Sequence, residues 1–509
     1  MAGKKQNILM IVADQLAPHF LPPYGHPVVR APNIEWIAER GVTFDAHYTS
    51  SPLCVPARAG YFTGHLPSRI GVFDSAGDFA SSVPTCGHYL RDLGYRTCIA
   101  GKCHFIGPDQ LHGFEDRTTS DICPAEMLWY SHWQRHGEEI LPWYHDFKNV
   151  KNSGIAERTT QQDHDFQTAQ TGVQWLYDWR RGSDDRPFFM HLSFTHPHDP
   201  YATPQRYWDR YDDSDIDMPV TPYQPPEERD AYAAWLYRHY DRGEIAVTDD
   251  DIRRSRHAYY GNISLVDDLI GEVLDALRAM RCLDDTIILL TADHGDMLGE
   301  RGQWYKMSPF ERSARVPMII SVPGGPAGRK STAVTSHPDI LPTLVSLATD
   351  GAPFNPATPL DGDDMTVLLE GGTDTWPDIA ISEFLFEGRT EPGLLLRKGR
   401  YKYVRADDSN DLLYDIESDP EELTDLSRDP AYASVLADLK EEVAARYDFD
   451  RLVPEIIAAQ DRHEFVCRAL LKGRQDSWAF QPFTDASRQF YRTTRTWHEQ
   501  EEADFLRFD

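Results

Sequence analysis

Short apolar runs alternate with amphipathic segments over most of the chain. The run Asn7–Ala13 is apolar and β-branched and stops at Asp14, which is typical of a buried strand. Similar runs predict strands at 95–100, 187–194, 286–291 and 316–322. Between about 254 and 280, apolar side chains recur at helical spacing, which predicts one long helix with a single apolar face, made of Ile263, Val266, Ile270, Val273, Leu274 and Leu277.

Two shorter helices are predicted at 32–40 and 85–93, because each of these segments is followed at once by a glycine. Strands that alternate with helices favour an α/β fold, in which helices flank a mostly parallel sheet. In such sheets, ligands bind beyond the carboxyl ends of the strands. Asp14 and Asp293 both follow a predicted strand. We therefore expect these two carboxylates to converge, although they are far apart in the sequence.

The pattern changes after about residue 395. Residues 400–405 and 411–415 alternate like antiparallel strands, and a helix is predicted at about 432–447. The last stretch is rich in arginine and aromatic residues and has no clear period. We predict a catalytic domain over residues 1–395, a smaller α+β subdomain over 396–460, and a tail over 461–509 that wraps the body or a neighbouring subunit.

Composition narrows the range of functions. The 509 residues are 41% hydrophobic and 12% aromatic, enough for a sizeable core, and their formal net charge is −30. This acidity argues against a nucleic-acid or anionic-membrane partner, although a few buried cations can still bind a small anion. No apolar run approaches the length needed to span a bilayer. Seven cysteines at irregular spacings suit a reduced protein. We expect a soluble cytoplasmic protein.

The most informative segment is Cys54-Val-Pro56-Ala-Arg58. Pro56 near the start and Gly64 near the end of this segment delimit a short helix. Cys54 then lies at a helix N-terminus, where unpaired N–H groups and the helix dipole favour anions. An isolated cysteine is more often a buried structural residue, but the Cys-x-Pro-x-Arg spacing favours a functional one.

This segment resembles the signature of type I sulfatases, a family in the alkaline phosphatase superfamily. Further segments resemble that family in the same order along the chain, and together they cover nearly all of it. They are Asn7–Gln15, the stretch from Gly94 to His104, Phe194–Tyr201, Thr291–Gly299, and Trp304–Lys306 with Glu311–Pro317. Many sulfatases have two adjacent aspartates where this chain has Asp14-Gln15, so one metal ligand is absent here.

The resemblance implies an alkaline-phosphatase-like fold and a formylglycine made by oxidation of Cys54. It also implies one divalent metal ion, Ca²⁺ or Mn²⁺, held by Asp14, Cys54, Asp293 and His294. The hydrated aldehyde would attack sulfur. Arg58, Lys102 and Lys306 would neutralise the transferring group, His198 or Lys306 would protonate the leaving oxygen, and His104 would orient the nucleophile or accept its second proton.

Within the family, the chain is most similar to the choline sulfatase branch. That likeness rests on Cys103–Asp116, Ser193–Tyr201 and Gly295–Gly302. A quaternary ammonium is held by aromatic faces and carboxylates. The candidates for those roles are Trp129, Glu383 and Glu387, although a core position is an equally good interpretation of Trp129. Two positions depart from the asparagines of that branch, Ser75 and Asp146, and allow a pocket reshaped for other alkyl or aryl sulfates.

We therefore predict a sulfuric-ester hydrolase that acts on a small sulfate ester such as choline sulfate. One alternative is a phosphonate or phosphate monoester hydrolase, or a promiscuous arylsulfatase, with the same site. Another is a non-catalytic protein that kept the fold and binds sulfate or metal. The resemblance also implies two partners, a formylglycine-generating enzyme during maturation and further copies of the chain in a dimer or tetramer.

Overall fold

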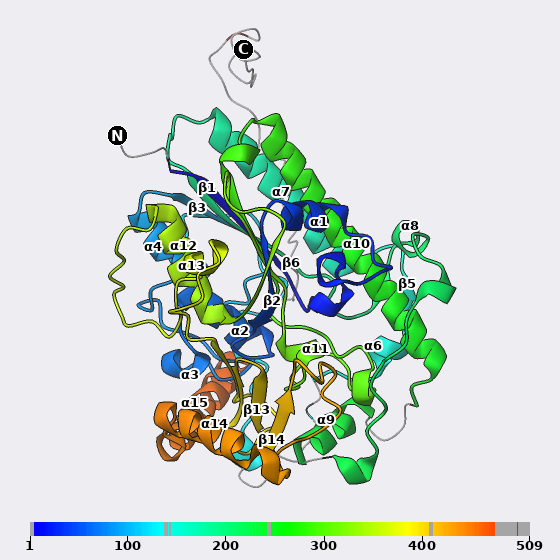
Figure 1. Ribbon diagram of the computed structural model, residues 1–509. Helices are drawn as coiled ribbons and strands as arrows, with labels where there is room; N and C mark the ends of the chain where they lie inside the picture. Colours follow the sequence, from blue (N-terminus) through cyan, green and yellow to red (C-terminus); the bar gives the residue numbers. More distant parts are fainter. Residues whose placement is uncertain are drawn as a thin grey trace.

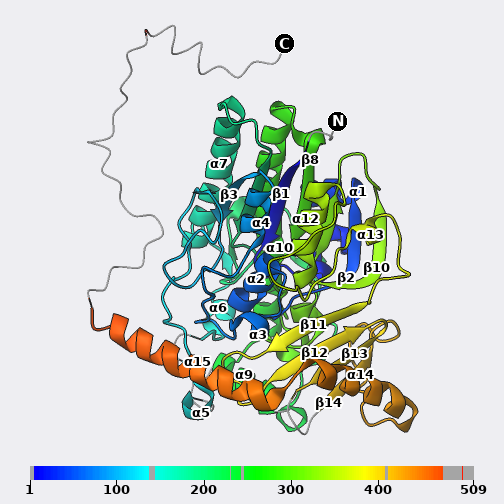
Figure 2. The same ribbon diagram turned by 90° about the vertical axis from the view of Figure 1, so that its left-hand side faces the viewer.

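The computed structural model describes residues 5–136, 141, 144–229, 231–241, 246–406, 411–473 and 496. An eight-stranded sheet runs through the middle of the molecule in the order β10-β2-β9-β8-β1-β6-β3-β4, and helices cover both of its faces (Figure 1). A four-stranded antiparallel sheet, β11-β12-β13-β14, lies at one end (Figure 2). The predicted α/β fold with a smaller α+β part is confirmed.

The strands of the large sheet are β1 (Asn7–Ala13), β2 (Val42–Tyr48), β3 (Arg96–Gly101), β4 (Asp116–Arg117), β6 (Phe188–Phe194), β8 (Thr286–Thr291), β9 (Met318–Ser321) and β10 (Arg329–Ser336). The small sheet contains β11 (Ile379–Phe384), β12 (Gly393–Lys398), β13 (Tyr401–Arg405) and β14 (Asp411–Asp415), and β5 (Gly154–Ile155) pairs with β7 (Ala202–Thr203).

Fifteen α-helices lie within the described residues: α1 (Pro32–Glu39), α2 (Cys54–Thr63), α3 (Pro67–Ile70), α4 (Cys86–Asp92), α5 (Trp133–His136), α6 (Lys148–Lys151), α7 (Thr160–Arg181), α8 (Gln205–Trp208), α9 (Ala231–Asp241), α10 (Asp249–Ala279), α11 (Glu311–Ala314), α12 (Ile340–Thr349), α13 (Thr366–Leu369), α14 (Ala433–Arg446) and α15 (Phe449–Leu470).

Strand β1 shows how the sequence pattern builds two cores. Its successive side chains point to opposite faces of the sheet. Leu9 and Ile11 join the cluster formed with α1, α7 and α10, whereas Ile8 and Met10 join the cluster formed with α2, α4 and α12. Both faces of this strand are therefore covered, which is why its sequence is continuously apolar rather than alternating.

The predicted strand at 316–322 is β9, but it runs antiparallel to both of its neighbours, β2 and β8. The other strand pairs of the large sheet are parallel. The long predicted helix is α10, which begins earlier than expected, at the capping box of Thr248 and Asp251. Strands β2 and β10 and helix α7 were not predicted.

The carboxy-terminal elements divide differently from the predicted boundaries. The small sheet begins at β11, before residue 395, and α15 continues across the predicted boundary at 460. The predicted wrapping tail lies mostly at 474–509, outside the described residues apart from Thr496.

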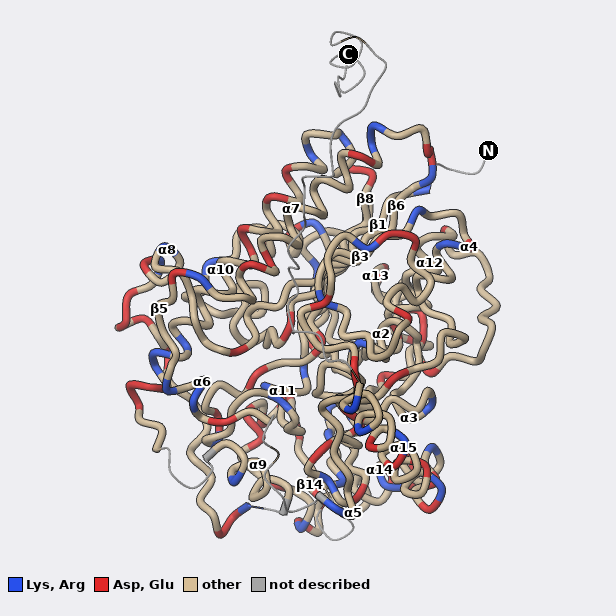
Figure 3. Tube along the Cα trace, turned by 180° about the vertical axis from the view of Figure 1, so that it is seen from behind, with Lys and Arg blue, Asp and Glu red and all other residues tan. Residues whose placement is uncertain are grey.

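Three further observations concern the cysteines, membrane-spanning helices and the placement of charged residues. All seven cysteines are free thiols. No helix among the described residues combines the length and apolar character needed to cross a membrane. Acidic and basic positions are interspersed over the outer helices and loops (Figure 3).

Candidate active site at the carboxyl edge of the sheet

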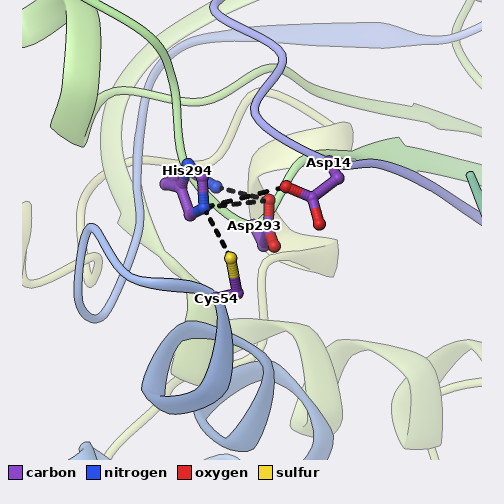
Figure 4. Close-up of side chains that lie close together, drawn as sticks. All are labelled: Asp14, Cys54, Asp293 and His294. Atoms are coloured by element: carbon purple, nitrogen blue, oxygen red, sulfur yellow. Dashed lines mark hydrogen bonds and ion pairs between the residues drawn. The ribbon is translucent and has the colours of Figure 1, made fainter. Parts of the chain in front are cut away.

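Two neighbouring parallel strands bring the distant aspartates together. Strands β1 and β8 pair so that Val12 lies opposite Thr291, and Asp14 and Asp293 follow just beyond these positions. His294 comes next on the β8 side, and Cys54 is the first residue of α2, facing them. Figure 4 shows the four side chains of Asp14, Cys54, Asp293 and His294 pointing toward one another. The expected convergence at this sheet edge is confirmed.

These four side chains can hold one metal ion. Each offers a ligand atom, and the four atoms lie within 4.8 Å of one another. His294 Nε2 is 3.1 Å from Cys54 Sγ and 3.8 Å from Asp14 Oδ1. That Asp14 oxygen is buried and has no hydrogen-bond partner. A buried carboxylate oxygen without a donor is costly unless a cation faces it, so the donor set fits a divalent cation.

Arg58 holds the two carboxylates rather than facing the substrate. Its Nε donates to Asp293 Oδ2 at 2.9 Å, and its Nη2 donates to Asp14 Oδ2 at 3.1 Å. The remaining guanidinium nitrogen donates to the carbonyl of Lys102, the hydroxyl of Ser193 and Tyr61. The side chain is buried and does not line the cavity described below. The geometry therefore does not support the predicted contact of Arg58 with the transferring group.

Lys102 lies between the carboxylates and Cys54. Its ammonium group forms an ion pair with Asp14 Oδ2 and lies 3.9 Å from Cys54 Sγ. Gly101 makes this placement possible, because it has φ +97° and a side chain there would collide with the Ser193 carbonyl.

The charges of this group act on one another. Burial and Cys54 would raise the pKa of Asp14, but Lys102, His198 and Arg58 hold that pKa well below its usual range. Burial would likewise raise the pKa of Cys54, yet Lys102, Lys306 and His294 lower it well below its ordinary value. An anion is therefore favoured at position 54.

Lys306 completes the cationic side of the site. Its Nζ donates to Gln15 Oε1 at 2.8 Å and lies 2.6 Å from His198 Nε2. His198 Nδ1 is 2.6 Å from the carbonyl oxygen of Asp199. Since a carbonyl only accepts, Nδ1 carries the proton and Nε2 accepts from Lys306. The pair thus holds one transferable proton at the edge of the cavity.

Gln15 replaces the second aspartate of many sulfatases, and its contacts show what the replacement does. Its backbone N–H donates to Asp293 Oδ1 at 3.0 Å. Its side-chain amide donates to Asp296 and accepts from Lys306. Gln15 therefore orients the Asp293 carboxylate and the Lys306 ammonium group.

Several site residues have a left-handed backbone, which is uncommon outside glycine. They are Gln15 (φ 62°), His104 (φ 57°), Tyr305 (φ 63°) and Met307 (φ 67°). His104 is held there by the buried carboxylate of Asp121, which accepts from the backbone N–H groups of Cys103 and His104. Such conformations persist only where neighbouring contacts impose them, and they concentrate at functional sites.

A cavity of about 490 Å³ opens onto these groups. Most of its accessible wall is apolar, with a few polar groups at the Cys54 end, as in sites for small organic molecules. Its walls contain the predicted residues Cys54, Lys102, His104, Trp129, His198, Lys306 and Glu387, together with Leu53, Ser75, Ile122, Cys123, Tyr144, His145, Thr160, Gln161, Thr195 and Met307. A larger cavity, of about 720 Å³, contains none of the predicted residues.

The two predicted substrate carboxylates lie in different places. Glu387 lines the cavity and accepts a hydrogen bond from the Ser75 hydroxyl at 2.6 Å. Burial and the nearby Asp74 raise the pKa of Glu387 to about 7. Glu383 does not line the cavity; its carboxylate accepts from Ser68 and from Tyr447. We correct its predicted contact with the substrate accordingly.

Tyr144, His145 and Cys123 are among the cavity residues that sequence reasoning missed. Tyr144 is buried, and His145 stacks on Tyr305 at 4.6 Å between ring centroids. The signal available for the first two was the aromatic density of the segment 129–147, of which only Trp129 was singled out.

Three family models match the chain, and all three describe sulfatases. Residues 6–351 match the Sulfatase family model, 299–448 match the C-terminal model of N-sulphoglucosamine sulphohydrolase, and 454–507 match the choline sulfatase enzyme C-terminal model.

Two curated relatives and one solved structure illustrate the range of similar proteins. The chain is 41% identical to a choline-sulfatase of Rhizobium meliloti (strain 1021), with 97% of this chain and 96% of that protein covered. It is 28% identical to an arylsulfatase of Clostridium perfringens, with 84% and 91% covered. The phosphonate monoester hydrolase of Agrobacterium radiobacter superposes with a TM-score of 0.69 at 25% identity, with 90% and 96% covered.

Proposed function

The chain belongs to the sulfatase family and is a sulfuric-ester hydrolase, and from this premise we propose that it cleaves choline sulfate or a related cationic alkyl sulfate. The observation that carries the proposal is the cavity itself. Its wall combines two groups of residues. We assign Cys54 and the buried cations Lys102 and Lys306 to the sulfate and call them the sulfate end, and we assign Trp129, Tyr144 and Glu387 to the departing alcohol and call them the leaving-group end. An anionic sulfate and a cationic leaving group each meet complementary charge.

We propose that Cys54 is converted to formylglycine and that one divalent cation, Ca²⁺ or Mn²⁺, is held by residue 54 with Asp14, Asp293 and His294. When bound, the cation polarises the transferring group and lowers the pKa of a nucleophilic hydroxyl. The hydrated aldehyde supplies that hydroxyl, and its second hydroxyl allows the sulfate to be released again.

Charged residues of the chain stabilise the negative charge of the transferring group and orient the carboxylates of the site. Lys102 and Lys306 stabilise negative charge on the sulfuryl oxygens, because both ammonium groups are buried at the Cys54 end of the cavity. Arg58 keeps the Asp14 and Asp293 carboxylates oriented through its ion pairs with them.

Two groups are placed to move protons. The Lys306–His198 pair holds a proton at the cavity wall, and we propose that this proton is transferred to the oxygen of the departing alcohol. His104, which also lines the cavity, either orients the nucleophile or accepts its second proton. Alkyl alcohols are poorer leaving groups than phenols, so this proton transfer matters more for them.

The leaving-group end suits a quaternary ammonium. Trp129 and Tyr144 offer aromatic faces, and Glu387 offers a carboxylate that forms no ion pair within the described part of the chain. Aromatic faces together with a carboxylate favour a cation over a neutral group of the same size. Ser75 donates to Glu387 and so orients the carboxylate in the wall.

Hydrolysis of phosphonate or phosphate monoesters is the second candidate function. It is supported by the similarity in fold to a phosphonate monoester hydrolase over 90% of the chain. A phosphonate monoester carries the same single negative charge as a sulfate monoester and a phosphate monoester carries one more, so both would use the same buried cations.

Initial rates with choline sulfate, an uncharged aryl sulfate and an aryl phosphonate test the proposal. We expect the ratio of kcat/KM to the rate constant of uncatalysed hydrolysis to be highest for choline sulfate. A preference for the phosphonate would support the second candidate function, and turnover of choline sulfate far below both others would overturn the proposed substrate.

Mass spectrometry of the peptide that contains Cys54 tests the nucleophile separately. In protein from a host with a competent formylglycine-generating enzyme, we expect the mass of the aldehyde. A fully active protein with an unmodified thiol would overturn the mechanism. Assembly into a dimer or tetramer remains a prediction, which size-exclusion chromatography of chains with and without residues 474–509 would check.

A further inference from the structure

Helix α15 (Phe449–Leu470) lies at the edge of the molecule where the small sheet also lies (Figure 2). One side of it enters an apolar cluster with residues from three other segments of the chain. The cluster contains Phe73, Trp133, Leu385, Leu452, Ile456 and Ala459. The segments around Phe73 and Leu385 are those that carry Ser75 and Glu387 into the cavity wall.

A chain of hydrogen bonds leads from α15 to Glu387. Gln460 Oε1 accepts from the backbone N–H of Trp133 at 2.9 Å. The indole Nε1 of Trp133 donates to the carbonyl of Phe386 at 3.1 Å. Phe386 directly precedes Glu387 in the sequence. Gln460 and Trp133 are both buried, so water does not replace either bond easily.

The same helix also contacts the segment that carries Ser75. His463 lies 3.8 Å from Asp74 and 3.7 Å from Asp78, and both aspartates flank Ser75 closely in the sequence. Ser75 in turn donates to Glu387. The Phe386 carbonyl, in the peptide bond that precedes Glu387, and the Ser75 hydroxyl, which donates to the Glu387 carboxylate, are therefore both attached to segments that contact α15.

We propose that Trp133 and Gln460 are positioning residues that determine the preference for a cationic leaving group, because they hold the Glu387 carboxylate in the cavity wall from α15. The inference rests on the proposed function, since it concerns the end of the cavity assigned to the cation. Neither residue lines the cavity, so neither contacts the substrate itself.

Two substitutions break different links of this chain. Trp133→Phe keeps an aromatic ring in the cluster and removes the donor to Phe386. Gln460→Met keeps the length of the side chain and removes the acceptor for Trp133. Trp179→Phe is the matched control, because Trp179 Nε1 donates to the Arg186 carbonyl at 3.0 Å, at the end of α7 and outside the cavity.

The test compares KM and kcat for choline sulfate and for an uncharged aryl sulfate, together with Tm. We expect Trp133→Phe and Gln460→Met each to raise KM for choline sulfate by about fivefold to tenfold, as the loss of one buried hydrogen bond allows. We expect kcat, and KM for the aryl sulfate, to change less than about twofold, as in Trp179→Phe.

A lower Tm with equal losses on both substrates would show a merely structural role and overturn the proposal. So would an unchanged KM for choline sulfate in both variants. If the unaltered protein itself shows no preference for the cationic ester, the proposed substrate fails and this inference fails with it. If that preference exists but the two variants keep it, only this inference fails.

Discussion

The two ends of the active-site cavity are built in different ways. At the sulfate end, Asp14 and Asp293 follow two paired strands of the large sheet, and a network of buried ion pairs fixes them. At the leaving-group end, Trp129, Tyr144 and Glu387 come from loops, and contacts with α15 and α5 support that wall. The sulfate end is thus suited to a fixed reaction, and the leaving-group end to a choice of substrate.

This difference predicts two classes of variant. Changes at the sulfate end should lower turnover of every ester, because they remove stabilisation of the shared transition state. Changes at the leaving-group end should raise KM for a cationic ester and leave an uncharged aryl ester almost unaffected.

The largest expected effect is that of Cys54→Ala. Without the precursor of the nucleophile, kcat should fall by at least ~10³-fold for all sulfate esters. The side chain lines the cavity rather than filling the core, so Tm should change little. Steady-state rates and a thermal melt check this, and residual activity near that of the unaltered protein would refute the role of residue 54.

Asp14→Asn should reduce kcat by about 10²-fold on both kinds of ester, because it removes one charge from the proposed metal ligands and the ion-pair partner of Lys102. Metal content, measured by elemental analysis after gel filtration, should fall in parallel. Full metal content in an inactive variant would instead assign Asp14 to the orientation of Lys102 and Arg58.

Glu387→Gln should raise KM for choline sulfate by about tenfold, which corresponds to ~1.4 kcal/mol of lost binding. It should leave kcat for choline sulfate, and both kcat and KM for the aryl sulfate, nearly unchanged. Glu383→Gln is the matched control, because Glu383 is equally buried but does not line the cavity. Equal effects of both substitutions would remove the distinction between the two ends of the cavity.

The smallest effect is a pH dependence of substrate preference. Burial and Asp74 raise the pKa of Glu387 to about 7. The carboxyl group is mostly neutral below that pH and gains its charge as the pH rises. KM for choline sulfate should therefore fall by about fivefold between pH 6 and pH 8, whereas KM for the aryl sulfate should not follow this curve. Glu387→Gln should abolish the difference between the two profiles.

Much of the sulfate end could be predicted from the sequence. Apolar runs that stop at a carboxylate mark strand ends, and the parallel order of β1 and β8 then makes Asp14 and Asp293 meet. Cys54 lies at the start of α2 because Pro56 and Gly64 delimit that helix locally. These signals are confined to a few consecutive residues, so they are visible without knowledge of the fold.

Other features depended on contacts between distant segments. Arg58 has the spacing of a substrate-binding cation, yet its donors are taken by two carboxylates from different strands. Glu383 and Glu387 are close in sequence, but only Glu387 lines the cavity, since Ser68 and Tyr447 hold the other. Strand β9 is antiparallel because of how the chain returns to the sheet, which its apolar sequence does not encode.

The sequence by itself therefore determined the fold class, the strand-end carboxylates and the cysteine at its helix N-terminus, because each follows from periodicity or local chain geometry. Which side chains line the cavity, and how α15 contacts the segments around Glu387, became visible only in the folded chain. Those features arise where burial, charge and hydrogen bonds from segments far apart in the sequence must be satisfied together.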